Sequence, residues 1–177
     1  PFNKFPQQNV FLSPEMKSTG EVIGFDRHLG SASAKAESGA GHYLPIVGTV
    51  FISVNDADKI KVIPMARDYK ELGFNIMATE GTAQLLSDNG VPANPVYKVG
   101  EGRPNVVDAI KNGEVQLVIN TPLGAQSRFD EYEIGRTAIR HKVPIITTIS
   151  GAQAAVRGIR NIKNNSIQYR SLQEVFD

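Results

Sequence analysis

The chain of 177 residues contains no cysteine. This absence excludes disulfides, thiol catalysis and cysteine-ligated metals, and it fits a cytoplasmic protein. No apolar run approaches the ~20 residues that a transmembrane helix requires. The formal net charge is only +1, so nothing in the composition favours nucleic acid or a membrane surface as a partner. The opening residues PFNKFPQQNV lack the apolar core of a signal peptide.

The first 46 residues show little periodicity, and Pro6 and Pro14 interrupt any long regular element. Gly20–Gly24 (GEVIG) is a candidate short strand, and the alanines of residues 27–38 favour a weak helix. The chain begins at Pro1 rather than at methionine, which we interpret as the start of a fragment or a processed product. We expect residues 1–46 to be the trailing end of something larger, packed across the outside of the following domain or against another copy.

Residues 47–160 alternate apolar strands with helical patterns. The candidate strands are Gly48–Val54, Phe74–Ala78, Val96–Val99, Val115–Ile119 and Pro144–Ile149. Near-continuous apolar runs such as VQLVIN are typical of strands that are covered on both faces. Short links between strands and helices therefore predict an α/β fold: a three-layer, Rossmann-like domain with a mostly parallel five-stranded sheet.

Start and stop signals bound the helices between these strands. Asp56 and Asp58 are expected to cap the first helix, and Pro104 to occupy a first helical position. Helices are expected to end before Gly73, Gly90 and Gly113. In the helix after the last strand, one apolar face is formed by Ala152, Ala155, Val156 and Ile159. Ser171 with Glu174 has the spacing of a capping box.

The ligand site of an open parallel sheet lies beyond the carboxyl ends of its strands. Almost every predicted strand is followed there by a hydroxyl, an amide, a glycine or a cation. Lys59 and Lys98 are point charges suited to phosphate, Thr79 and Thr82 offer hydroxyls at a helix start, and Asn120 and Thr121 end the fourth strand. Ordinary turns are also rich in these residue types, but five such junctions together favour a pocket for an anion.

The motifs of several enzyme classes are missing. No G-x-x-x-x-G-K-[ST] or G-x-G-x-x-G spacing is present, which excludes phosphate-loop ATP hydrolysis and the dinucleotide fingerprint. The histidines at 28, 42 and 141 do not cluster in sequence. We identify no nucleophile, no carboxylate–histidine pair, no catalytic residue and no metal site. This combination predicts that the chain binds an anion without transforming it.

Several runs carry a family resemblance. STGEVIG, preceded by PFNKFP and SPEM, resembles the end of the second ATP-grasp half of the carbamoyl phosphate synthetase large chain. SVNDADK, ATEGTAQLL, KVGEGRPNVVDAIKNG, INTP and RTAIRHKVPIITT resemble the methylglyoxal-synthase-like regulatory domain at the C-terminus of that family. The resemblance covers nearly the whole chain. It implies that residues 1–46 are the tail of the ATP-grasp half with a linker, and residues 47–177 the allosteric domain.

The resemblance also implies a function. Family members bind a nucleotide monophosphate such as UMP or IMP, and the matching positions are Lys59, Thr79, Thr82, Lys98, Asn120 and Thr121. Ornithine binds at the interface with the synthetase portion, which Thr147 would face. Pro122 stands where some UMP-regulated members carry threonine.

The parent protein of such a domain is an ATP-dependent ligase that uses Mg or Mn as its metal cofactor. It makes carbamoyl phosphate from bicarbonate, glutamine-derived ammonia and ATP for pyrimidine and arginine synthesis. The implied partners are the rest of the large chain and the glutaminase small chain, with a homo-oligomer as a further option. No cofactor is expected in this chain itself.

Two alternatives stay open. The same fold serves methylglyoxal synthase, a lyase acting on a triose phosphate through an aspartate in a Gly-Gly-Asp loop. The corresponding loop here reads Gly100-Glu101-Gly102-Arg103-Pro104, which leaves Glu101 as the remaining candidate base. The other alternative is a structural domain that mediates oligomer contacts, in which the polar junctions are ordinary turns.

Overall fold

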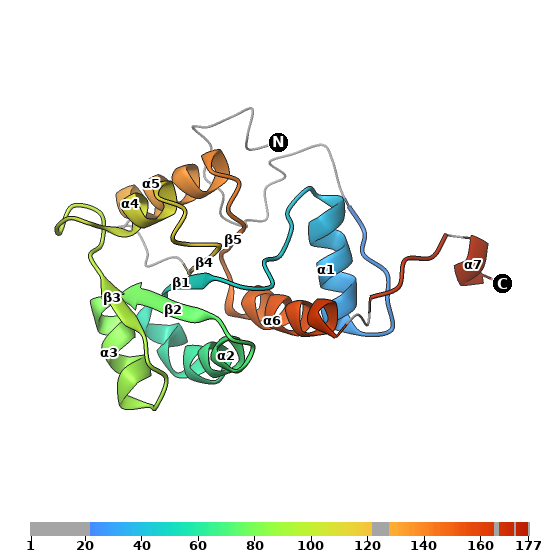
Figure 1. Ribbon diagram of the computed structural model, residues 1–177, viewed down its shortest axis with the longest axis horizontal. Helices are drawn as coiled ribbons and strands as arrows, with labels where there is room; N and C mark the ends of the chain where they lie inside the picture. Colours follow the sequence, from blue (N-terminus) through green and yellow to red (C-terminus); the bar gives the residue numbers. More distant parts are fainter. Residues whose placement is uncertain (1–21, 122–127, 165–166, 172, 177) are drawn as a thin grey trace.

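Five parallel strands form the centre of the molecule in the order β3-β2-β1-β4-β5 (Figure 1). The computed structural model describes residues 22–121, 128–164, 167–171 and 173–176. The strands are β1 (Thr49–Ser53), β2 (Asn75–Thr79), β3 (Asn94–Val96), β4 (Leu117–Asn120) and β5 (Ile145–Ile146). Each neighbouring pair is parallel, so all five carboxyl ends lie at one edge. The predicted α/β fold and five-stranded sheet are confirmed, and the pairing in the sheet is parallel throughout.

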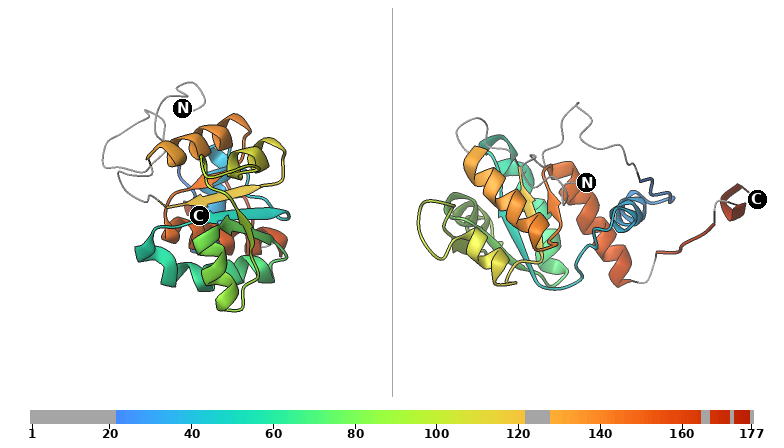
Figure 2. Two further views of the ribbon diagram at one scale, coloured as in Figure 1. Left: turned by 90° about the vertical axis from the view of Figure 1, so that its left-hand side faces the viewer. Right: turned by 90° about the horizontal axis from the view of Figure 1, so that it is seen from above.

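Helices cover both faces of this sheet, which gives the three predicted layers (Figure 2). One face carries α4 (Val106–Lys111) and α5 (Arg128–Arg140). The other carries α2 (Lys59–Glu71), α3 (Glu80–Asp88) and α6 (Ile149–Lys163). None of the helices in the described part of the chain is long and apolar enough to cross a membrane.

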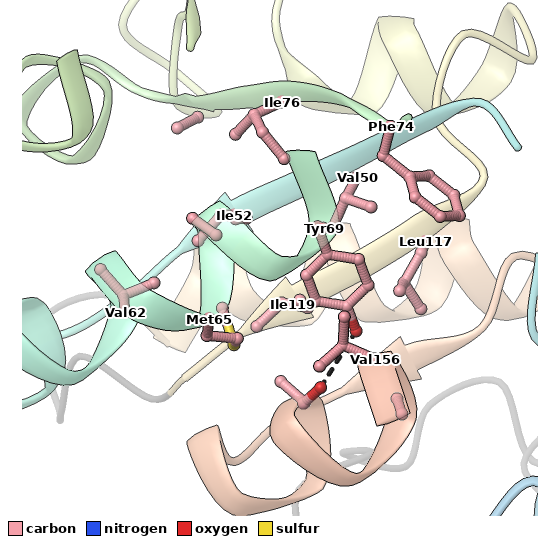
Figure 3. Close-up of a cluster of buried hydrophobic side chains, with 14 of the residues drawn as sticks. Val50, Ile52, Val62, Met65, Tyr69, Phe74, Ile76, Leu117, Ile119 and Val156 are labelled. Carbon is pink, nitrogen blue, oxygen red and sulfur yellow. Dashed lines mark hydrogen bonds between the residues drawn. The ribbon is translucent and has the colours of Figure 1, made fainter. Parts of the chain in front are cut away.

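The strands alternate their side chains between two buried clusters. Val50 and Ile52 of β1 belong to the cluster beneath α2, α3 and α6, whereas Phe51 belongs to the cluster beneath α4 and α5. In the first cluster Tyr69 meets Phe74 edge to face, with ring centroids 5.8 Å apart (Figure 3). The Tyr69 hydroxyl donates to the carbonyl of Ala152 at 3.1 Å, which satisfies a polar group that is otherwise enclosed by apolar side chains.

All five strands differ from their predicted bounds, and the third and fifth differ most. The third strand is Asn94–Val96, because these residues lie beside Met77–Thr79 of β2 and the chain then turns away from the sheet. Pro95 is tolerated because β3 is an edge strand, where a missing N–H breaks no ladder hydrogen bond. The fifth strand is only Ile145–Ile146, because Thr148 caps α6 through a hydrogen bond from the Gly151 amide at 3.1 Å.

Two predicted helix starts differ in detail from the structure. Asp58 occupies the cap position of α2 but makes no side-chain capping hydrogen bond, and Asp56 and Asp58 belong to a 3-10 turn, η1 (Asp56–Asp58), whose cap is Asn55. Pro104 lies before the cap of α4, which is Asn105. The Asn105 side chain accepts a hydrogen bond from the Asp108 amide, and the Asp108 side chain accepts one from the Asn105 amide at 3.1 Å. Asparagine accepts hydrogen bonds from the first helical amides as well as aspartate does.

Other predicted signals are confirmed. Glycines follow α2, α3 and α4 with positive φ values, at Gly73, Gly90 and Gly113. The apolar face of α6 is buried at Ala152, Ala155, Val156 and Ile159. The Ser171 amide donates to Glu174 at 2.7 Å, forming the expected capping box before α7 (Gln173–Phe176).

The described part of residues 1–46 lies against the outside of α6 (Figure 1). Residues 22–24 of the predicted GEVIG strand belong to no strand. The predicted weak helix is α1 (Leu29–Gly39). Ser31 accepts a hydrogen bond from Asn161 of α6 at 2.8 Å, and Ala34 is buried in the same cluster as α6.

Candidate functional site

Three buried polar side chains stand abreast at the carboxyl edge of the sheet. Ser53 of β1 is paired with Asn120 of β4. Because Ile52 is paired with Ala78, Thr79 of β2 lies beside Ser53 on the other side. The three residues, which we call the polar row, are at most 5% exposed. Polar groups rather than apolar ones therefore end the three central strands.

The polar row points toward the face that carries α4 and α5. Side chains two residues apart in a strand share a face, and Phe51, Met77 and Val118, two positions before the row, all belong to the cluster on that face. Within this row the Nδ2 atom of Asn120 is buried and has no hydrogen-bond partner among the described residues. A buried donor without an acceptor costs about 1–3 kcal/mol, so this atom is a candidate contact for a ligand.

The start of α3 adds donors beside the row. Thr79 is the residue before the first helical turn, and its hydroxyl lies 3.4 Å from that of Thr82. A Cβ placed on Gly81 would meet no atom within 4 Å, so the first turn of α3 faces open space. Free amides and the partial positive charge of a helix start favour an anion.

Both predicted lysines flank this edge, and each is held by a carboxylate of its own loop. Lys59 lies 2.6 Å from Asp56, and the hydrogen bond from Lys59 lowers the pKa of the Asp56 carboxyl. Lys98 lies 3.4 Å from Glu101, which also accepts from the Lys98 amide at 3.4 Å. An anion that engages these lysines must therefore compete with Asp56 and Glu101.

The start of α5 comes close to the same loop. Burial raises the pKa of the Asp130 carboxyl, and the negative charge of Glu101 adds to this effect while Lys98 opposes it. The surroundings of Lys98 are thus acidic as well as basic. Glu101 itself is half-exposed and paired with Lys98, rather than enclosed as a general base would be.

A hollow opens on the other side of the same edge. It has a volume of about 480 Å³, and we call it the α6 cavity because the start of α6 forms one wall. Thr121 and Thr147 line it, together with Asp58, Lys61, Thr148, Ile149, Ser150 and Gln153. Asn120 and Thr121 are consecutive but point to opposite faces, since Ile119, two residues before Thr121, lies in the other cluster.

The walls of the α6 cavity are fixed by hydrogen bonds between two strand ends. The amide of Asn55 and its Nδ2 donate to the Thr121 hydroxyl at 3.0 and 3.2 Å, and the Thr121 amide donates to the Ser53 carbonyl at 3.0 Å. Asp58 accepts from Asn55 Nδ2 at 2.9 Å and lies 4.0 Å from Lys61. A carboxylate, an ammonium and several hydroxyls thus line one small hollow.

The predicted site residues therefore divide into two groups. Thr79, Thr82 and Asn120 lie at the polar row and the start of α3, with Lys59 and Lys98 on the flanking loops. Thr121 and Thr147 line the α6 cavity. Pro122 lies outside the described residues.

The predicted set of effector-binding residues did not include Ser53 of the row, nor Asp58 and Lys61 of the cavity. Whether Ser53 lies beside Thr79 and Asn120 depends on the register between β1 and its neighbouring strands. Asp58 and Lys61 carried a usable signal, because the three-residue spacing places them on one side of a helical turn. No group of three or more histidines, aspartates and glutamates that would suit a metal ion occurs in the described part of the chain.

Comparisons with known proteins agree with this architecture. A family model described as "MGS-like domain" matches residues 61–147. The carbamoyl phosphate synthase large chain of Nostoc sp. is 51% identical over 174 residues, which is 98% of this chain and 16% of that protein. This chain belongs to the MGS-like domains of carbamoyl phosphate synthase large chains.

Other relatives extend the same match. The arginine-specific large chain of Oryza sativa, named as chloroplastic, is 47% identical over 177 residues, 99% of this chain and 15% of that protein. The "large chain, C-terminal section" of Aquifex aeolicus is 46% identical over 182 residues, 100% of this chain and 34% of that protein. This chain thus spans 16% of the length of the large chain from Nostoc.

Proposed function

We propose that this MGS-like domain is the regulatory, effector-binding part of a carbamoyl phosphate synthase and that it binds a nucleotide monophosphate of the UMP or IMP class. The observation that carries the proposal is the polar row with its buried Asn120 Nδ2, which lacks an acceptor among the described residues. An enzyme site would need an enclosed acid or base, whereas this edge offers hydrogen-bond donors, hydroxyls and two lysines.

In this proposal the phosphate of the nucleotide lies in front of the first turn of α3. Thr79 and Thr82 provide hydroxyls there, and Lys59 and Lys98 provide charge. Charged hydrogen bonds of this kind contribute more than neutral ones. Asn120 donates a hydrogen bond to the ribose or base through its Nδ2 atom, which thereby gains the acceptor that it lacks among the described residues.

We propose the α6 cavity as this domain's part of the ornithine site. Asp58 suits an ammonium group, and the start of α6 and Lys61 suit a carboxylate, so the hollow matches a zwitterionic amino acid. Thr121 and Thr147 supply hydroxyls on the same walls. The cavity is open, which fits a site that a second domain of the parent completes.

Effector binding at this domain would control the ATP-dependent synthesis of carbamoyl phosphate elsewhere in the parent protein. That reaction would use Mg or Mn and would take place in the cytoplasm. A glutaminase small chain would be the partner of the parent. An effector changes that activity only if it binds two states of the parent with different affinity.

Isothermal titration of this chain with UMP and with IMP tests the nucleotide proposal, with inorganic phosphate as a reference. We expect Asn120→Leu to weaken nucleotide binding at least tenfold without lowering stability, because it replaces an unpaired buried donor by an apolar group of similar size. Asn112→Ala, at an exposed asparagine, is the matched control and should bind normally. Absence of nucleotide binding both here and in the intact parent enzyme would disprove the proposal.

We prefer effector binding to a lyase acting on a triose phosphate, because Glu101 is half-exposed and engaged with Lys98. Release of methylglyoxal from dihydroxyacetone phosphate, at a rate that Glu101→Gln abolishes, would reverse this preference. A purely structural role would leave the polar row empty in crystals soaked with phosphate.

A further inference from the structure

A carboxylate is buried on the side of α5 that packs against the sheet. Glu131 is only 3% exposed, and Ile134 and Ala138, three and seven residues later, belong to the apolar cluster beneath α4 and α5. Residues at this spacing share one side of a helix, so Glu131 faces the sheet as they do. Glutamate is almost never buried to this extent without polar partners, so its position marks a polar region in an otherwise apolar layer.

The first turn of α5, which carries Glu131, lies at the carboxyl edge of the sheet. Strand β4 ends at that edge with Asn120, whereas α5 ends only a few residues before β5 begins. The helix therefore runs from the carboxyl edge back to the amino edge. Burial raises the pKa of Asp130 in the same turn, and the charges of Glu101 and Lys98 act on that carboxyl. This turn thus lies beside the loop that follows β3.

Glu131 and Asn120 of the polar row belong to the same layer of the molecule, between the sheet and α5. The Asn120 side chain points into this layer, two positions after Val118 of the apolar cluster, and Glu131 faces the sheet from the opposite wall. Asn120 Nδ2 has no hydrogen-bond partner among the described residues, so no oxygen of Glu131 contacts it. A buried donor and a buried acceptor therefore border the same edge without meeting.

A ligand group between these two side chains must accept a hydrogen bond from Asn120 and donate one to Glu131. The Nδ2 atom of asparagine only donates, and an ionised carboxylate only accepts. A hydroxyl does both at once, and the hydroxyls of a nucleotide belong to its ribose. Thr79, where the phosphate is proposed to lie, is two strands away from Asn120, or roughly 10 Å. That span leaves room for a pentose between the phosphate and Asn120.

We propose that Glu131 contacts the ribose of the ligand and accepts hydrogen bonds from its 2′- and 3′-hydroxyls, so that the site selects ribonucleotides over 2′-deoxyribonucleotides. This inference rests on the proposed nucleotide site and adds the residue that decides which sugar it takes. A site built to bind a hydroxyl rejects the analogue that lacks it, because buried polar groups then lose their partner. The two oxygens of Glu131 offer about four acceptor sites, so ribose contacts are compatible with its interactions inside the domain.

Isothermal titration of this chain with UMP and with dUMP tests the selection. We expect UMP to bind at least tenfold more tightly than dUMP. Equal affinities would overturn the inference and leave the proposed nucleotide site intact. If neither nucleotide binds, the proposed function fails, and ribose 5-phosphate against 2-deoxyribose 5-phosphate decides the inference alone. A tenfold preference for the ribose compound would support it, and equal binding or no binding of the two would overturn it.

Substitution of Glu131 separates contact with the sugar from a merely structural role. Glu131→Leu should lower the ratio of UMP affinity to dUMP affinity at least fivefold, whereas a structural role would weaken both nucleotides equally and leave the ratio unchanged. Glu131→Gln keeps the shape of the side chain and should lower the ratio at least threefold, because a neutral acceptor binds hydroxyls less strongly than a carboxylate. This variant decides the question if Glu131→Leu does not fold.

Glu133→Leu is the matched control on the same helix. Glu133 is more exposed than Glu131 and lies 3.8 Å from Arg136, so its carboxylate is engaged away from the apolar layer. The ratio of UMP affinity to dUMP affinity should stay as in the wild type. An equal fall of the ratio in Glu133→Leu and Glu131→Leu would contradict the proposal, because it would make the general negative charge of α5 responsible.

Discussion

Asn55 and Thr121, 66 residues apart, join the ends of two neighbouring strands. The Asn55 amide donates to the Thr121 hydroxyl at 3.0 Å, and Asn55 Nδ2 donates to the same oxygen at 3.2 Å. This one hydroxyl therefore fixes the loop that follows β1 against the end of β4. The polar row and the α6 cavity both border this junction, since Asn120 belongs to the row and Thr121 lines the cavity.

Thr121→Val should destabilise the domain by about 1–3 kcal/mol, because it leaves the Asn55 amide without its acceptor in a partly buried place. Chemical denaturation measures the change. Thr147→Val is the control: Thr147 is buried at the same cavity, but within the described residues its hydroxyl joins no two strand ends. A loss as large for Thr147→Val would show that packing rather than the hydrogen bond matters.

Lys98 and Glu101 should have opposite effects on anion binding. We expect Lys98→Ala to weaken nucleotide binding by about 1.5–3 kcal/mol, as for the loss of a charged hydrogen bond. Glu101→Gln should strengthen it, because the lysine no longer pairs with a carboxylate 3.4 Å away. Titration calorimetry of both variants checks the signs, and an unchanged dissociation constant for Lys98→Ala would remove this lysine from the site.

Gly158 should resist substitution although it lies inside a helix. A Cβ there would come within 2.8 Å of the Gly30 carbonyl and 3.1 Å of the Ala34 Cβ, and overpacking of this kind costs about 1–3 kcal/mol. Gly158→Ala should therefore lower the melting temperature despite the better helix propensity of alanine. Gly81→Ala is the control, since a Cβ at Gly81 meets nothing within 4 Å; it should be neutral or slightly stabilising.

Asp26 should make stability depend on pH in acid. Its hydrogen bond from Lys35 and, to a smaller extent, the bond from the His28 amide lower its pKa below the usual 3.8. The unfolded chain then binds a proton at higher pH than the folded chain. The stabilisation is thus fully present above 3.8 and is lost as the pH falls through the lowered folded pKa. For a pair near the surface it amounts to less than about 1 kcal/mol.

Urea denaturation of wild type, Asp26→Asn, Lys35→Met and the double variant isolates this contribution. The coupling between the two substitutions should be present at neutral pH and absent in strong acid, well below the folded pKa of Asp26. A coupling of the same size under both conditions would assign the effect to packing of the Lys35 stem rather than to charge.

Most of the sheet was predictable because apolar runs such as VQLVIN require burial on both faces. Edge elements were less predictable. Pro95 made β3 difficult to predict, since proline is acceptable in a strand at the edge of a sheet and the sequence does not show that β3 is an edge strand. The caps at Asn55 and Asn105 were missed because aspartates and a proline nearby carry equally strong local signals.

The sequence indicates which polar residues follow strands, but not how they are arranged. Lys59, Thr79, Thr82, Lys98, Asn120, Thr121 and Thr147 all follow strands, and parallel strands bring their carboxyl ends to one edge. The pattern does not reveal that Lys98 is paired with Glu101, or that Asp58 and Lys61 line a cavity with Thr121.

The order of apolar and polar residues alone determined the α/β class of this domain, its parallel sheet and the edge at which ligands are expected, because burial and strand direction follow from local pattern. Tertiary structure decided which polar residues meet. The register of β1 between β2 and β4 places Ser53, Thr79 and Asn120 abreast, and the pleat turns Thr121 to the other face. Only that arrangement separates one predicted group of residues into the polar row and the lining of the α6 cavity, since a shift of a single residue in register would exchange the faces.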